Sequence, residues 1–426
     1  MTRADVTAES FGEDVLGPIF AEFCLRLWSV TALLDRPDEV TVLFCARGGL
    51  RMQQGYEAFL GTSGLPATVR LAPLMVSRLV AVRPALLRTV EQHRKTLTTA
   101  AADTLAYEFP QRTVAEVAEV VSGAVPGSGR RWDAGFTSEG FAELLHHADG
   151  QPVVAALARQ TELFTRHLVS ALDGRRRGVL VDTGLFGTTA QLLRDGFDDL
   201  DLSSVLIARS NYRRVADPPQ GKVFGLSVQA DGYSPLHRRT AMLRYWHFIE
   251  SLFEPDLDSV RTFTEVDGQP RSNLEVGDWT DRIGPAPGSA YAGLLAYLES
   301  LPPGPAEKIQ SDADQAWNRF RRAVVWPDVA HGFALTAGRR SWDFGSDVTF
   351  TDRPPGGALA ALRGSSMWRE GEIARSGSIL RLPLLTAIEG AHSLRRLHYA
   401  VGRSASKRRP VLRSIGRSRP KRGRSG

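Results

Sequence analysis

The stretches LFCARGGL (Leu43–Leu50) and VLVDTGLFGTT (Val179–Thr189) decide the fold of this chain. In each, a short apolar run ends at a charged residue, Arg47 or Asp182, and passes into glycines. The pattern predicts a buried strand, a tight loop and then a helix, an arrangement that presents backbone N–H groups to an anion. Because such loops meet at the carboxyl edge of a parallel sheet, the two stretches predict a binding site for a phosphate-bearing ligand.

The segments around these two stretches alternate between helical and strand patterns. Apolar residues at three- and four-residue spacing predict helices over residues 11–32, 50–60, 113–121, 152–172 and 191–197. Short β-branched or apolar runs predict strands over residues 40–46, 70–77, the Val179 run and 204–209. We therefore expect an α/β fold, an open, Rossmann-like and mainly parallel sheet flanked by helices.

Composition changes twice along the chain, and the changes predict three parts. Residues 1–265 are expected to form the α/β phosphate-binding domain, and residues 266–390 a helical and irregular subdomain. Within the latter, residues 267–287 are rich in Gly, Pro and Asp and predict a loop or domain edge, while residues 291–301 and 316–325 predict helices. Residues 391–426 form a basic tail that we expect to be disordered.

The basic charge of the chain is concentrated in this tail. No acidic residue follows Glu389, whereas twelve Lys and Arg do, which leaves 41 basic against 47 acidic residues in the rest of the chain. The tail, chiefly Arg403–Arg424, is a candidate for contact with an anionic membrane surface or with nucleic-acid phosphates. A solvated terminus without a partner is the alternative.

Cysteine usage and hydropathy indicate the compartment. Cys24 and Cys45 lie in apolar stretches and are expected in the core, which favours a reducing environment. The first residues are polar, and no uninterrupted apolar run approaches the length of a membrane span. We expect a cytoplasmic protein, either free or peripheral at the inner membrane face.

Arg47, Gly48 and Gly49 have two interpretations of equal weight. In the structural one, the glycines permit a sharp exit from the strand and Arg47 is solvated. In the functional one, the glycines let backbone N–H groups approach a pyrophosphate while Arg47 adds charge-assisted hydrogen bonds. Ser77 and Arg78, at the end of another predicted strand, form a third candidate contact, with a surface arginine as the alternative.

The second glycine loop carries the candidate catalytic residue, Asp182. A carboxylate at the end of an apolar strand must be paired, capped or metal-bound. It either caps the following helix or acts as a Mg²⁺-associated acid, a ribose-hydroxyl acceptor or an acid–base group. The residues expected to bind ligand around it are Thr183, Gly184, Gly187, Thr188 and Thr189.

Other motifs are weaker. His247 and Glu250 share a helix face in RYWHFIESLF, and the aromatic residues around them favour packing in the core or in a groove. The histidines show no metal-ligand spacing, and the chain contains no CxxC, GxSxG or Walker motif.

Five segments, in this order and spacing, resemble a bacterial family. They are GPIFAEFCLRLW, VTVLFCARGGLRMQQGYEAFL, LMVSRLVAVRPAL, GVLVDTGLFGTTAQLL and FIESLFEPDLDSVRTF, and together they span about Phe11–Phe263. The family is the large predicted haloacid-dehalogenase-superfamily proteins found with glycosyltransferases in surface-polysaccharide loci. The resemblance is to the region that follows their hydrolase domain. It implies a role in cell-surface polysaccharide biosynthesis, with glycosyltransferases as partners.

The chain departs from that family at both loops. The family usually has Arg-Asp-Gly where this chain has Arg47-Gly48-Gly49, and Asp-Ile-Gly-Trp-x-Gly-Thr where it has Asp182 through Thr188. No Asp-x-Asp-x-Thr segment precedes Phe11, so the hydrolase domain itself is expected to be absent. Gly184 stands where a dehalogenase motif has its second Asp, and phosphatase activity of that type is therefore not expected.

The two loops also resemble, more loosely, the site of type I phosphoribosyltransferases. In those enzymes an Arg-Gly-Gly loop contacts pyrophosphate, and a strand ending in paired acids before Thr-Gly-x-Thr holds the ribose phosphate. Arg47-Gly48-Gly49 is similar to the former, and Asp182–Thr189 to the latter with one acid instead of two. The sequence thus leaves two functions open. The chain is either an enzyme acting on a phosphorylated sugar or nucleotide, as transferase or hydrolase, or a non-catalytic ligand-sensing or scaffold protein.

Overall fold

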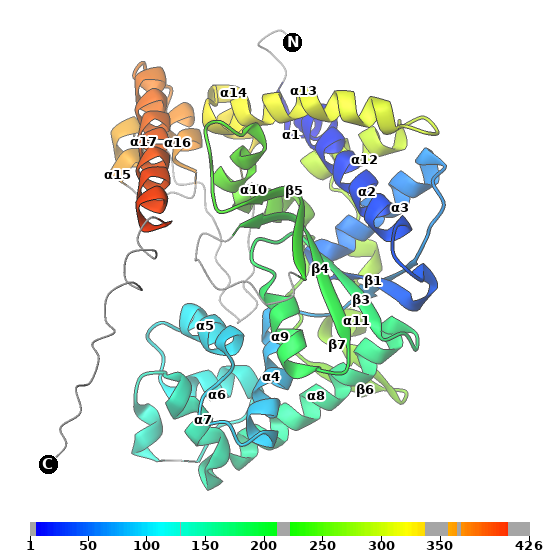
Figure 1. The fold of residues 1–426 in the computed structure, drawn as a ribbon, viewed down its shortest axis with the longest axis vertical. Helices are drawn as coiled ribbons and strands as arrows, with labels where there is room; N and C mark the ends of the chain where they lie inside the picture. The colour runs from blue at the N-terminus through cyan, green and yellow to red at the C-terminus, as the bar shows by residue number, and fades with distance from the viewer. Residues whose placement is uncertain (1–5, 128, 211–221, 337–356, 364–367, 408–426) are drawn as a thin grey trace, which may run out of the picture.

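A five-stranded parallel sheet forms the centre of the molecule (Figure 1). The structure is a computed structural model, and it describes residues 6–127, 129–210, 222–336, 357–363 and 368–407. The strands lie in the order β2-β1-β3-β4-β5, and every pairing is parallel. Their bounds are β1 Val40–Cys45, β2 Arg70–Leu74, β3 Arg177–Asp182, β4 Asp201–Ser210 and β5 Val223–Ala230. The expected α/β fold with a parallel sheet is confirmed.

The chain leaves β1 and β3 in opposite directions along the sheet. After β1 it passes through α3 (Gly48–Ser63) to β2 on one side, and after β3 it passes through α9 (Thr188–Gly196) to β4 on the other. Because such crossovers are right-handed, most of α3 and all of α9 pack on opposite faces of the sheet. The strand order therefore reverses between β1 and β3, and a crevice forms at their carboxyl ends.

Both faces of the sheet are buried, which explains why the strands are apolar throughout. In β1, Val42 and Phe44 join one core, whereas Leu43 and Cys45 join the other. The first core is completed by α2 (Gly17–Ala32), α3, α10 (Trp246–Phe253), α12 (Ala290–Glu299) and α13 (Ala306–Val325). The second is completed by α4 (Arg78–Glu91), α5 (Thr99–Glu108), α6 (Val114–Ser122), α7 (Ser138–His146), α8 (Gln151–Leu172) and α9.

The N-terminal helical stretch is part of the first core. It runs from α1 (Ala8–Phe11) through a π-helical segment (Gly12–Leu16) into α2. Among the described residues, Ala8–Ala32 is the one helix long and apolar enough to cross a membrane, and 67% of that apolar window is buried inside the fold. Its apolar character is accounted for by packing against α12 and α13.

The segment after residue 265 differs from the expected loop. It contains a β-hairpin, β6 (Phe263–Val266) and β7 (Gln269–Ser272), followed by α11 (Asn273–Val276). Asp267 and Gly268 both have positive φ, at 51° and 72°, as a two-residue hairpin turn requires. The expected boundary after residue 265 falls inside this hairpin, and α12 and α13 beyond it share the core of the sheet.

The C-terminal part is helical, as predicted. It comprises α14 (Val329–Ala334), α15 (Ala358–Arg363), α16 (Arg369–Arg375) and α17 (Arg381–Lys407). Trp368 connects this part to the sheet domain. Its ring stacks on that of Tyr245, with the ring centroids 4.4 Å apart, and its Nε1–H donates to the Val324 carbonyl (2.9 Å). α17 continues past residue 391, where we expected disorder to begin, and residues 408–426 of the tail lie outside the described residues.

A buried histidine holds the end of β2 in place. His167 of α8 accepts the backbone N–H of Met75 at Nε2 (3.1 Å), and its Nδ1 lies 3.9 Å from the Glu275 carboxylate. Burial lowers the pKa of His167 below its ordinary value of 6.5, and Glu275 opposes that shift. The folded state therefore favours the neutral imidazole. Above pH 6.5 the imidazole is neutral in the folded and the unfolded state. Below pH 6.5 the unfolded state binds the proton more readily, so the free energy of unfolding falls.

We expect the free energy of unfolding to fall as the pH is lowered from about 7.5 to about 5.5, in part because His167 must be protonated in the unfolded state. The variant H167Q should be less stable at the higher pH and should lose less stability on acidification. The exposed His237 provides the control, and H237Q should retain the wild-type pH dependence. Chemical denaturation at several pH values measures both, and an unchanged pH slope in H167Q contradicts the role assigned to His167.

Candidate ligand-binding site

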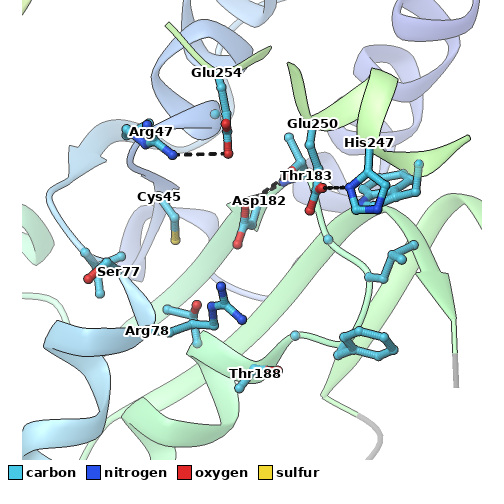
Figure 2. Close-up of a pocket in the computed structure, with 18 of the residues that line it drawn as sticks. Cys45, Arg47, Ser77, Arg78, Asp182, Thr183, Thr188, His247, Glu250 and Glu254 are labelled. Atoms are coloured by element: carbon cyan, nitrogen blue, oxygen red, sulfur yellow. Dashed lines mark hydrogen bonds and ion pairs between the residues drawn. The ribbon is translucent and has the colours of Figure 1, made fainter. Parts of the chain in front are cut away.

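A cavity of about 430 Å³ lies at the carboxyl edge of the sheet, where β1 and β3 end (Figure 2). It brings together all but one of the predicted site residues. Those that line it are Arg47, Gly48, Ser77, Arg78, Asp182, Thr183, Gly184, Gly187, Thr188 and Thr189. Gly49 does not line it. A Cβ at Gly49 would lie 2.8 Å from the Phe44 carbonyl carbon, so this glycine lets α3 pack against the sheet.

The register of the sheet explains why the two loops meet. Phe44 of β1 is paired with Val181 of β3, so Cys45 and Asp182 follow on neighbouring strands about 4.8 Å apart. Burial, together with the charge of Asp182, raises the pKa of the Cys45 thiol well above its ordinary value. Cys45 is therefore a neutral part of the cavity wall and not a thiolate nucleophile.

Three helices begin at the cavity. α3 starts at Gly48, α4 at Arg78 and α9 at Thr188, and each of these residues lines the cavity. The first turn of a helix carries backbone N–H groups without intrahelical partners, and the helix dipole adds positive potential there. The cavity therefore combines the favourable ends of three dipoles at a position where anions bind in many α/β proteins.

Arg47 is buried and is not the solvated residue of the structural interpretation. Its guanidinium forms an ion pair with Glu254 (3.3 Å) and donates to the Leu257 carbonyl (2.8 Å). Figure 2 shows this pair at one side of the cavity. Arg47 thus connects the loop after β1 to the segment that follows α10, and its positive charge lies at the cavity wall already paired with a carboxylate.

The loop after β3 depends on glycines at two positions. Gly184 has φ +115°, and a Cβ there would lie 2.4 Å from the Ala208 carbonyl oxygen. Gly187 has φ +65°, and its Cβ would lie 2.6 Å from Val223 Cγ1. The loop is also held against β4, because the N–H of Ser210 donates to the Leu185 carbonyl (2.9 Å). The loop is therefore a closely packed element whose backbone follows the cavity.

Asp182 is not the N-cap residue of the following helix, the position that the capping interpretation gave it. α9 begins at Thr188 with Gly187 as its N-cap and has no side-chain cap. Asp182 Oδ1 instead accepts the N–H of Thr183 (2.7 Å) and its hydroxyl (3.3 Å). These contacts orient the carboxylate at the end of β3, where it lines the cavity between the two glycine loops (Figure 2).

Ser77 and Arg78 are engaged with the protein as well. The hydroxyl of Ser77 accepts the N–H of Val80 (3.2 Å), which caps α4, and donates to the Val260 carbonyl (2.6 Å). Arg78 pairs with Glu108 of α5, whose side chain is 2% exposed. Arg78 and Glu108 both line the cavity, so the structure favours the predicted position of Arg78 at the site over the alternative of a surface arginine.

The remaining wall comes from α5, from α10 and from the turn before α10. His247, Glu250 and Glu254 lie on one face of the α10 segment and line the cavity, while Phe248 and Ile249 point into the core. Of the core or groove packing that we expected for His247 and Glu250, the structure shows a position in the cavity wall and not in the core. Sequence reasoning also missed other lining residues, namely Thr104, Tyr107, Glu108, Leu243, Arg244, Trp246 and Glu254. The recurrence of His247, Glu250 and Glu254 at positions i, i+3 and i+7 within an apolar helix was the available signal.

Charges around the cavity are mixed. The arginines Arg47, Arg78 and Arg244 pair with Glu254, Glu108 and Glu370 respectively. Among the described residues, no group of three or more His, Cys, Asp or Glu side chains is placed to hold a metal ion. The cavity can therefore offer both cationic donors and carboxylate acceptors to one ligand.

Comparisons with known proteins add no assignment. No family model and no curated protein matches this chain. The chemistry of the cavity is accordingly the basis for the function proposed below.

The positive φ at Gly184 predicts that a larger residue at this position destabilises the protein. We expect G184A to lower the free energy of unfolding by about 2–4 kcal/mol, because the new Cβ meets the Ala208 carbonyl in an unfavourable backbone conformation. Gly61 near the end of α3 has open space around it and serves as the control, and G61A should raise the free energy by up to about 1 kcal/mol. Urea unfolding of both variants tests this. Equal stability of the two would show that the loop is not constrained in the way described.

Proposed function

We propose that this cavity binds a phosphorylated sugar and that the protein acts on it by transfer or hydrolysis. The observation that carries the proposal is the meeting of three helix N-termini with Asp182 around one cavity at the switch point of the sheet. Phosphate oxygens suit the backbone N–H groups of those helices. Carboxylates accept hydrogen bonds from sugar hydroxyls, and Asp182 and Glu250 are candidates for that contact.

Size and charge support a small ligand that carries both phosphate and hydroxyl groups. The cavity volume of about 430 Å³ lies within the usual range for small-molecule sites. Three arginines line the wall together with four carboxylates, which are Glu108, Asp182, Glu250 and Glu254. This composition opposes a polyanion that binds without a cation. It suits a sugar phosphate whose hydroxyls contact the carboxylates and whose phosphate charge is offset by Mg²⁺.

The likeness of both loops to those of phosphoribosyltransferases suggests the type of ligand. We propose a sugar phosphate activated as a pyrophosphate at its anomeric carbon, for which 5-phosphoribosyl 1-pyrophosphate is the probe. Asp182 is the one carboxylate at the end of β3, and Mg²⁺ is usually held by one or two carboxylates together with substrate phosphates. Asp182 therefore fits a magnesium ion that enters as part of the ligand. Bound there, the ion would neutralise phosphate charge.

A non-catalytic, ligand-sensing protein is the second candidate. Two observations favour it. Gly48 and Gly184 stand where the resembled families carry acids, and the guanidinium of Arg47 is held by Glu254 and the Leu257 carbonyl. In either case we propose, from the resemblance alone, a role in cell-surface polysaccharide biosynthesis with glycosyltransferases as partners. Attachment of Arg403–Arg424 to an anionic membrane or to nucleic acid stays a prediction, as does a cytoplasmic location.

Ligand binding and turnover are tested together. We expect the magnesium complex of 5-phosphoribosyl 1-pyrophosphate to raise Tm, because a ligand at a hundred times its Kd stabilises the folded state by about 2.7 kcal/mol. D182N should abolish turnover and leave Tm nearly unchanged, since an amide oxygen still accepts the N–H of Thr183. D195N, on the far end of α9 and outside the cavity wall, is the control and should behave as wild type.

Each outcome separates the candidates. Stabilisation without turnover of the ligand supports the sensing protein, and turnover supports the enzyme. If 5-phosphoribosyl 1-pyrophosphate, ribose 5-phosphate, pyrophosphate and nucleotide sugars all leave Tm unchanged, with and without Mg²⁺, the cavity is not a phosphosugar site.

A further inference from the structure

His247 and Glu250 form a hydrogen-bonded pair in the cavity wall. Nδ1 of His247 lies 3.1 Å from Oε2 of Glu250, and the two side chains are 29% and 14% exposed. Both line the cavity, and Figure 2 shows them to the right of the Arg47–Glu254 pair. The apolar face of α10 holds them there, because Phe248, Ile249 and Leu252 are buried in the first core.

This pairing has a chemical consequence. A carboxylate that accepts the Nδ1–H of an imidazole orients the ring, selects the tautomer with its lone pair on Nε2, and stabilises the imidazolium once a proton is taken up. Imidazole is the side chain best suited to exchange protons near neutral pH. A histidine–carboxylate pair in the wall of a ligand cavity can therefore take a proton from a bound ligand or give one to it.

The charged groups around this pair come from every wall of the cavity. Glu250 and Glu254 lie on α10 and just after it, and Arg244 precedes that helix. The opposite wall contributes the ends of β1 and β3, α4 and α5. The charged residues there are Arg47, Asp182, Arg78 and Glu108. Of these, Glu250 is hydrogen-bonded to the ring of His247.

We propose that His247 is the general acid–base residue of this site and that Glu250 is its positioning residue. The proposal rests on the proposed function. For an activated sugar phosphate, Nε2 of His247 removes the proton from the O–H bond of an acceptor hydroxyl or water. The acceptor oxygen forms a bond to the anomeric carbon. The bond from that carbon to the pyrophosphate oxygen breaks, and its electron pair leaves with the pyrophosphate.

With water as the acceptor, the products are ribose 5-phosphate and pyrophosphate, and the proton on His247 passes to solvent. Release of pyrophosphate from magnesium 5-phosphoribosyl 1-pyrophosphate is therefore the reaction to measure, both in water alone and with added sugar acceptors. His331 and Asp328 provide a matched pair outside the cavity wall. They have the same three-residue spacing, and Nδ1 of His331 lies 2.7 Å from Oδ1 of Asp328.

We expect H247Q to lower kcat by about 10²- to 10⁴-fold while the ligand-induced rise in Tm persists. The wild-type rate should fall on acidification as the imidazole is protonated, and this acidic limb should be absent in H247Q. E250Q keeps an acceptor for Nδ1–H and should therefore retain more of the wild-type kcat than E250A does. E250A should lower kcat without a matching change in KM, whereas H331Q should match wild type.

Three results would overturn the assignment. If H247Q retains the wild-type rate and its acidic limb, another group exchanges the proton. If the ligand raises Tm but the wild-type protein releases no pyrophosphate, the cavity binds the ligand without this chemistry, and His247 has no catalytic role. If the ligand leaves Tm unchanged, the proposed function fails and the assignment of His247 fails with it.

Discussion

The parallel pairing of β1 with β3 is the constraint on which the rest of this structure depends. It places Cys45 and Asp182 on adjacent strands at one edge of the sheet, although 136 residues separate them. Because the chain leaves the two strands in opposite directions, neither α3 nor α9 covers that edge. The crevice that results is lined by the loops that follow both strands, and the whole cavity is built upon it.

Ion pairs in the cavity wall and close backbone contacts then hold the loops in one arrangement. The Arg47–Glu254 pair connects the loop after β1 to the end of α10, and the Arg78–Glu108 pair connects α4 to α5. Pairing offsets the hydration that an arginine loses on burial, and each of these arginines has its carboxylate in place before any ligand arrives. Such preorganisation reduces the ordering that a ligand must bring about when it binds.

The difference between expectation and structure is largest where tertiary contacts decide a residue's role. Asp267 and Gly268 carry the signal of a two-residue hairpin turn, but the surrounding Gly, Pro and Asp residues favoured a loop. Around His247 and Glu250, the aromatic neighbours favoured packing. Those neighbours do pack, yet the periodicity of α10 turns the two polar residues toward the cavity. The composition of a segment reflects its more numerous apolar residues. It does not show toward which side of the helix the few polar residues point.

By itself, the sequence determined the parallel α/β architecture, the two glycine loops and the residues at their strand ends, because apolar periodicity and glycine placement act over a few residues. It could not determine the partners of those residues. That Arg47 is paired with Glu254, that Gly49 packs against the sheet, and that α5 and α10 complete the wall were decided only by the tertiary structure. The physical reason is that pairing and burial depend on segments brought together from distant parts of the chain, and local patterns carry no record of which segments meet.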